Sequence, residues 1–181
     1  SVCETKTKHL LPFFFRFMDN EYYTQQNRLL SNGYEDLTRS SSSINDDDTD
    51  HLKNQTPKEK FLNKTLLNKT LCAFLDIFAK FTSPKSWYQE ERLKNDIFLN
   101  FLCHDEAAVQ KCALSCLYVY NYSHVTPYKE HLERLLEGKH FRNELVVFSL
   151  NDNTGAVHSD HRDALLPIIM RILFLKFHSL V

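Results

Sequence analysis

The chain has 181 residues, of which 43% are hydrophobic and 25% are charged, so its composition supports a packed core and counts against global disorder. Only 3 residues are glycine, which counts against β-sandwiches, β-barrels and glycine-rich phosphate loops. The formal net charge is −1, from 22 Lys and Arg against 23 Asp and Glu. A nucleic-acid-binding surface that covers the whole chain is therefore not expected.

The first part of the chain divides into two segments of different composition. Residues 1–30 are predicted to be an aromatic-rich helical segment. In residues 31–59, acidic residues outnumber basic ones, serines run together from Ser40 to Ser43, and large apolar residues are few. We expect 31–59 to be a flexible acidic linker or an insertion. The aromatic side chains of the first segment need a partner surface; they are Phe13, Phe14, Phe15, Phe17, Tyr22 and Tyr23.

Residues 60–181 are predicted to form successive amphipathic helices. The first runs from about 61 to 81, because apolar residues recur there every three or four positions and so share one helix face. Ser83 is expected to cap the second helix, with Pro84 in its first position. The predicted core positions are Leu67, Leu71, Phe74, Phe78 and Phe81 in the first helix, and Leu93, Ile97 and Phe101 in the second.

The remaining helices follow from turn signals. A third helix is expected to begin near Asp105, and a fourth lies between Thr126-Pro127 and Gly138, where glycine should follow the helix end. A short fifth element comes next. Pro167 should kink the last helix or mark its true start. The predicted core positions are Val109, Ala113, Leu117 and Tyr120, with Cys112 and Cys116 beside them, then Tyr128, Leu132, Leu135 and Leu136, then Phe141, Leu145 and Phe148, and finally Leu165, Ile168, Ile169, Ile172, Leu173 and Phe177.

This succession of helices predicts an all-α fold of stacked helical hairpins, a HEAT- or armadillo-like α-α solenoid segment. Asp105, Val109, Ala113 and Leu117 occupy the positions that the second helix of a HEAT-type repeat gives to these residue types, although Gln110 replaces the usual arginine. Such a hairpin cannot bury its apolar face alone and needs neighbouring hairpins.

Two clusters of titratable residues offer chemistry, and a structural role is favoured for both. A zinc site would use Cys103, His104, Cys112, Cys116 and His124. No CxxC pair accompanies them, and the two helical cysteines lie on the apolar face, which favours core packing over zinc.

The second cluster precedes the last helix and would offer acid-base chemistry. No nucleophile motif accompanies it, and Asp is expected as a cap or first-turn residue there, so capping is favoured. The sequence thus predicts no catalytic residue, no cofactor, no metal and no small-molecule substrate. The cluster consists of His158, Asp160, His161 and Asp163.

A modest basic group surrounds the fourth helix, with glutamates interleaved. Glu130 and Arg134 are expected to pair across one helix turn. The group is therefore expected to be a solvated, self-paired face, and phosphate contact is the weaker alternative. Its members are Lys129, Arg134, Lys139 and Arg142.

The cysteines and the apolar stretches indicate the cellular environment of the protein. The 5 cysteines are odd in number and match no disulfide framework, which favours a reducing, intracellular environment. The apolar stretches 10–18 and 164–181 contain charged residues, Arg16 in the first and Arg171 and Lys176 in the second. Neither a signal peptide nor a membrane span is expected, and no membrane partner.

A longer pattern extends from about residue 79 to residue 176. It consists of the residues 79–81 and 84–86, the run from Pro127 to Leu136, residues 141–145, and His161-Arg162 with 166–173. In order, spacing and residue type, these stretches resemble the down-regulated-in-metastasis family, component 20 of the small-subunit processome. The last residues, 174–181, depart from the family pattern, which suggests a truncated gene model or an alternative exon.

The resemblance implies a segment of a very large nucleolar HEAT/armadillo-type solenoid. Members of the family associate with the U three small nucleolar RNP and the 90S pre-ribosome, and they are needed for cleavages that lead to 18S rRNA. They are scaffolds without catalytic residues. The implied partners are processome proteins, the small nucleolar RNP and, through local basic patches, pre-rRNA. A HEAT-type adaptor in nuclear transport or in a phosphatase assembly is the alternative.

Overall fold

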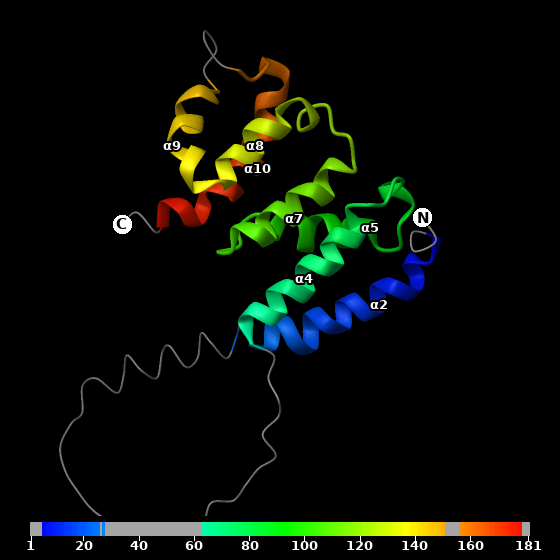
Figure 1. The fold of residues 1–181 in the computed structure, drawn as a ribbon. Helices are drawn as coiled ribbons and strands as arrows, with labels where there is room; N and C mark the ends of the chain where they lie inside the picture. The colour runs from blue at the N-terminus through cyan, green and yellow to red at the C-terminus, as the bar shows by residue number, and fades with distance from the viewer. Residues whose placement is uncertain (1–4, 26, 28–62, 151–155, 179–181) are drawn as a thin grey trace, which may run out of the picture.

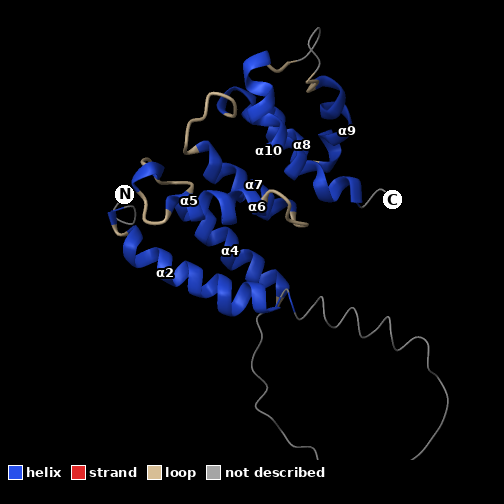
Figure 2. Ribbon diagram, turned by 180° about the vertical axis from the view of Figure 1, so that it is seen from behind, coloured by secondary structure: helices blue, strands red, loops and turns tan. Residues whose placement is uncertain are grey.

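The computed structural model describes residues 5–25, 27, 63–150 and 156–178 (Figure 1). Within these ranges all regular secondary structure is helical, and loops join the helices (Figure 2). The predicted all-α class is therefore confirmed. The segment 31–59, predicted to be a linker, lies outside the described residues.

The aromatic-rich N-terminal segment folds as one helix, α2 (Thr7–Phe17), which continues into a π-helical turn, η1 (Met18–Tyr22). It lies alongside α4 (Lys64–Phe78) in both views (Figures 1 and 2). The Phe14 ring packs against Phe74 and Phe78, with centroids 5.3 and 5.2 Å apart. The expected partner surface is thus α4 for Phe14 and Phe17, whose rings both contact Phe74. Tyr22 packs instead against Phe101, and Phe13 is 67% exposed.

Helix α4 begins at Lys64 because the Asn63 side chain accepts a hydrogen bond from the Thr65 N–H at 3.3 Å, which caps the helix. The predicted apolar stripe is confirmed, with Phe74 half-buried against α2 and the other four residues buried. Leu75 is fully buried as well, on the side of α4 that faces α7 (Ala107–Tyr118). The sequence pattern missed it because α4 is covered on two sides.

The second helix begins at Glu90, so the predicted start at Ser83 is wrong. Pro84 opens only a short 3-10 turn, η2 (Pro84–Ser86). Gln89 then adopts a left-handed backbone conformation, with φ 53° and ψ 41°, which separates that turn from the helix. The helix itself is continuous through α5 (Glu90–Arg92), the π-helical η3 (Leu93–Phe98) and α6 (Leu99–Phe101). Its predicted core residues Leu93, Ile97 and Phe101 are buried.

Helix α7 packs against α4, η3 and α6 on one side and approaches α8 (Lys129–Leu136) on the other. The predicted core residues of both helices are buried, and Tyr128 is buried in the 3-10 turn η4 (Thr126–Tyr128). Cys116 is fully buried, whereas Cys112 is half-buried. Val109, Ala113 and Leu117 of the HEAT-like pattern therefore lie on the packed face of α7, whereas Asp105 precedes the helix and is exposed.

Gly138 does not end the fourth helix but begins α9 (Gly138–Val147), which corrects the predicted role. Glu137, with φ −87° and ψ 113°, is extended and separates α8 from α9, so no left-handed glycine is needed. Leu145 is 37% exposed, although it was predicted to be buried. Glu144 is buried in its place because it lies one position earlier, on the face of α9 that packs against α8.

Helix α10 (Ser159–His178) contains Pro167 in its interior, so that residue does not mark the helix start. The predicted core positions from Leu165 to Leu173 are buried, and the helix contacts α8 and α6. The Phe177 side chain lies outside the described residues. The helices thus pack successively, α2 on α4, α4 on α7, α7 on α8, and α8 on α9 and α10 (Figure 1).

Candidate functional site

Two of the residues considered for zinc, Cys112 and Cys116 of α7, pack against or within the core. The Cys116 thiol donates to the Leu75 carbonyl at 3.1 Å, between α7 and α4. Burial, and then the neighbouring Cys72 thiol, raise the pKa of Cys112 to about 12, so its thiol stays protonated at neutral pH. Among the described residues, no three His, Cys, Asp or Glu side chains are gathered so that they could hold a metal ion.

His104 instead joins the N-terminal helix to the turn before α7. Its Nε2 lies 2.7 Å from the Tyr22 hydroxyl, and its Nδ1 accepts the Glu106 N–H at 2.9 Å. Burial is the largest cause of its lowered pKa, so the ring is neutral near neutral pH. Beside it, the Lys64 ammonium donates to Asp105 at 2.6 Å. Sequence reasoning missed this junction because its partners are far apart in the chain.

The His158 cluster organises the start of α10. The His158 N–H donates to the Tyr128 hydroxyl at 3.0 Å, and that hydroxyl lies 2.9 Å from His161 Nδ1. The Asp160 N–H donates to His158 Nδ1 at 3.4 Å, and Asp160 lies in the first turn of the helix. Asp163 is exposed. Asp160 thus lies in the first turn, as expected, but the side chain that accepts a helix N–H is that of His158. The other contacts tie the helix start to η4.

The predicted basic group is divided among separate partners. Arg134 pairs with Glu130 at 3.8 Å, as expected, and also with Glu144 at 3.9 Å. Lys139 pairs with Glu137 at 3.8 Å. The Lys129 ammonium lies 4.9 Å from the Tyr118 ring centroid, and Arg142 is exposed on α9. The four cations therefore do not converge, and two of them are neutralised.

A buried carboxylate holds α8 and α9 together. The Glu144 side chain is 6% exposed and forms a short hydrogen bond with His131 Nδ1. The His131 ring stacks on Phe148, with centroids 4.8 Å apart and planes 4° from parallel. We name Glu144, His131 and Arg134 the Glu144 cluster. The sequence did not predict this cluster. Glu144 and His131 lie on different helices, and no regular spacing along the chain indicates that they meet.

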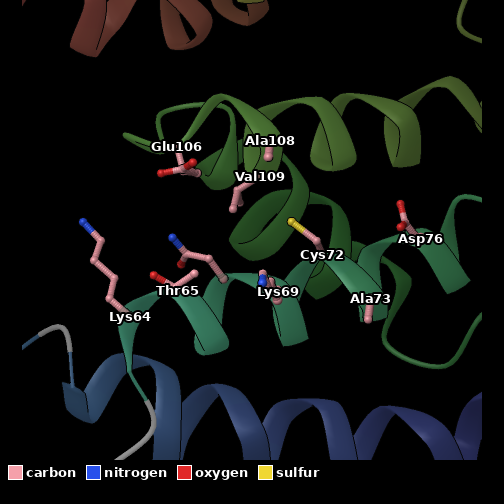
Figure 3. A pocket seen from close by; sticks show the side chains of 10 residues that line it. Lys64, Thr65, Lys69, Cys72, Ala73, Asp76, Glu106, Ala108 and Val109 are labelled. Carbon is pink, nitrogen blue, oxygen red and sulfur yellow. The ribbon is translucent and has the colours of Figure 1, made fainter.

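A groove of about 520 Å³ runs between α4 and the start of α7 (Figure 3). Its charged walls are mixed, since Lys64 and Lys69 are opposed by Asp76 and Glu106. Cys72 of α4 and Val109 of α7 also line the groove, from its two facing sides (Figure 3). Such a groove does not favour one sign of ligand charge.

Exposed apolar side chains are concentrated on the last two helices. On α9, Val146 is 79% exposed. On α10, Leu166, Met170 and Phe174 recur every four residues, which places them on one face, and their exposures are 43, 56 and 58%. None of the described helices is long and apolar enough to cross a membrane. A strip of this kind typically marks a surface for another protein element.

Comparisons with known proteins identify relatives for most of this region. A family model described as "U3 small nucleolar RNA-associated protein 20, N-terminal" matches residues 65–179. The U3 small nucleolar RNA-associated protein 20 of Schizosaccharomyces pombe is 31% identical over 119 residues, which are 65% of this chain. Its counterpart in Saccharomyces cerevisiae is 27% identical over 101 residues, or 56% of the chain. The aligned part amounts to only 5% and 4% of the length of these two relatives.

Proposed function

Because the chain belongs to the U3 small nucleolar RNA-associated protein 20 family, we propose that it is a scaffold segment of a ribosome-biogenesis factor. Its place of action would be the small-subunit processome, where it supports pre-rRNA processing towards 18S rRNA. The role is non-catalytic, and the location is the nucleolus. The family match over residues 65–179 is the observation that carries this proposal, because it covers every helix from α4 to α10.

The arrangement of the helices suits a scaffold. Each helix buries one face against the next helix in the stack. The outer faces of the first and last helices are therefore available to neighbouring segments. One of these is the α10 strip of Leu166, Met170 and Phe174. Further helices of the same long family protein are the expected cover, because the chain spans only 4–5% of the length of its relatives.

The names of the two relatives indicate the partners that we propose for this chain. Both are called U3 small nucleolar RNA-associated, so the U3 RNP and processome proteins are the proposed partners of this chain. Contact with pre-rRNA would depend on local cations, because the net charge of the chain is only −1.

Affinity purification of the tagged protein from growing cells tests this function. We expect U3 RNA and 18S precursors to be enriched over a tagged, unrelated helical protein, and the tag to locate in the nucleolus. Depletion of the protein should lower mature 18S rRNA and raise its precursors. Recovery of transport factors or phosphatase subunits without U3 RNA would instead favour the adaptor alternative.

A further inference from the structure

Two adjoining hollows lie where the loops after α4 and α7 meet. Each has a volume of about 450 Å³. They share Thr82, Val119 and Asn121 as walls, so they form one continuous surface feature. We name it the 82–121 groove. Lys129 lines one of the two hollows and Lys85 lines the other.

The charges of the 82–121 groove have one sign. None of the residues that line either hollow is acidic. Lys85 and Lys129 are both exposed, and within the described ranges neither is paired with a carboxylate. The α4–α7 groove contains two acids, and Arg134 and Lys139 are already paired with glutamates. The 82–121 groove is therefore better suited to an anion than either of those surfaces.

The polar groups of this groove are held in place before any ligand arrives. The Tyr118 hydroxyl donates to the Lys129 carbonyl at 3.3 Å, and the Lys129 ammonium lies over the Tyr118 ring. Asn121 has φ 51°, a left-handed conformation that asparagine tolerates, and its N–H closes a turn on the Tyr118 carbonyl at 3.1 Å. Prior ordering of this kind lowers the entropic cost of binding.

A column of flat rings adjoins the groove. Tyr120 lines one hollow and stacks on Tyr122, with centroids 5.3 Å apart and planes 8° from parallel. Tyr122 stacks in turn on His124, at 5.2 Å and 21°. Tyr120 is only 8% exposed and Tyr122 lies between two rings, so the half-buried His124, at the end of the column, is the ring on which a base would stack. Cationic grooves combined with aromatic rings are typical of sites for single-stranded nucleic acid, because phosphates meet the cations and bases stack on the rings. An acidic peptide would make use of the cations alone.

We infer that the 82–121 groove binds single-stranded RNA, with the ammonium groups of Lys85 and Lys129 and the side-chain amide of Asn121 donating hydrogen bonds to its phosphate oxygens. The inference rests on the proposed function for the biological source of that RNA. Of the basic group predicted from sequence, only Lys129 belongs to this proposed RNA site. Arg134 and Lys139 are paired with glutamates and are not part of it, whereas Lys85 and Asn121 are.

Fluorescence anisotropy with the purified 181-residue chain and a labelled RNA of about 12 nucleotides tests the inference. The double variant Lys85→Gln/Lys129→Gln should bind several-fold more weakly, to the same extent for different sequences. The slope of log affinity against log salt should shrink by about 1.4, or about 0.7 for each lysine–phosphate pair removed. The matched control, Lys8→Gln/Lys139→Gln, removes the same charge away from the groove and should bind as the unmodified chain does.

Lys85→Gln alone leaves the Tyr118–Lys129 contact intact, so it remains informative if the double variant is misfolded by circular dichroism. Unchanged affinity and salt slope in a folded groove variant would overturn the inference. Equal displacement of the RNA by polyglutamate of the same charge would also overturn it, since the site would then be one for acidic proteins. Either failure leaves U3 co-purification standing, whereas RNA binding without U3 enrichment would count against the proposed function alone.

Discussion

The two ends of the helical stack are stabilised by different means. Around α2 and α4, aromatic side chains form a connected buried network in which Phe14, Phe78 and Trp87 are at most 5% exposed. Around α8 and α9, a buried carboxylate joins the helices, and apolar side chains of α9 and α10 are left exposed. The first region is covered by helix α2, whereas the second has an apolar strip on α10 whose three side chains are 43 to 58% exposed. Further protein elements are therefore expected to dock at the α10 end.

The comparison is tested most strongly by neighbouring phenylalanines of α2. Phe14 is fully buried against α4, and Phe13 beside it is 67% exposed. We expect Phe14→Ala to lower the free energy of unfolding by about 3–5 kcal/mol, because the large cavity removes ring packing with Phe74 and Phe78. Phe13→Ala should change it by less than about 0.5 kcal/mol. Urea unfolding followed by circular dichroism measures both, and equal effects would show that α2 does not cover α4 in solution.

The Glu144 cluster provides the corresponding test at the other end. Glu144→Ala should lower the free energy of unfolding by about 1–3 kcal/mol, because it removes the acceptor of His131 and Arg134. The loss stays below that of Phe14→Ala because both partners retain access to water. Glu130→Ala is the control, since the Glu130 side chain is 85% exposed and its pair with Arg134 contributes at most about 0.5 kcal/mol. A larger effect at Glu130 would contradict the assignment of a buried tie between α8 and α9.

The sequence predicted what depends on local periodicity. The stripes from Leu67 to Phe81 and from Leu165 to Leu173 were visible because one helix face repeats every three or four residues. The left-handed backbone at Gln89 and the burial of Glu144 were not visible. Glutamine does not signal a left-handed conformation as glycine or asparagine does. The burial of Glu144 depends on His131 and Arg134 of another helix, and a carboxylate is placed in a core only when a specific partner compensates its charge. For the same reason the basic group was predicted as one set, although only Lys129 lines the 82–121 groove.

The junction between η1 and the turn before α7 should give the aromatic end a pH dependence. Burial lowers the pKa of His104 in the folded protein, so the unfolded chain takes up a proton first as the pH falls. The contribution of neutral His104 to the free energy of unfolding is therefore fully present above the unfolded pKa of about 6.5, and it is lost as the pH falls below that value. Thermal unfolding between about pH 7.5 and pH 5 should show this loss, which His104→Gln should reduce. An unchanged pH profile in that variant would assign the loss to other histidines, such as His124, whose pKa is also lowered by burial.

The smallest expected effect concerns the step between α8 and α9. Gly138 is the first residue of α9, its backbone is not left-handed, and a Cβ added there would meet no atom within 4 Å. Gly138→Ala should therefore raise the free energy of unfolding by about 0.5–1 kcal/mol, because alanine loses less backbone entropy on folding. A loss of stability would instead support the role predicted from sequence, a left-handed glycine after α8. Because this change touches no side chain, a gain would show that the backbone order of α9 contributes to the stability of this end of the stack, in addition to the Glu144 cluster.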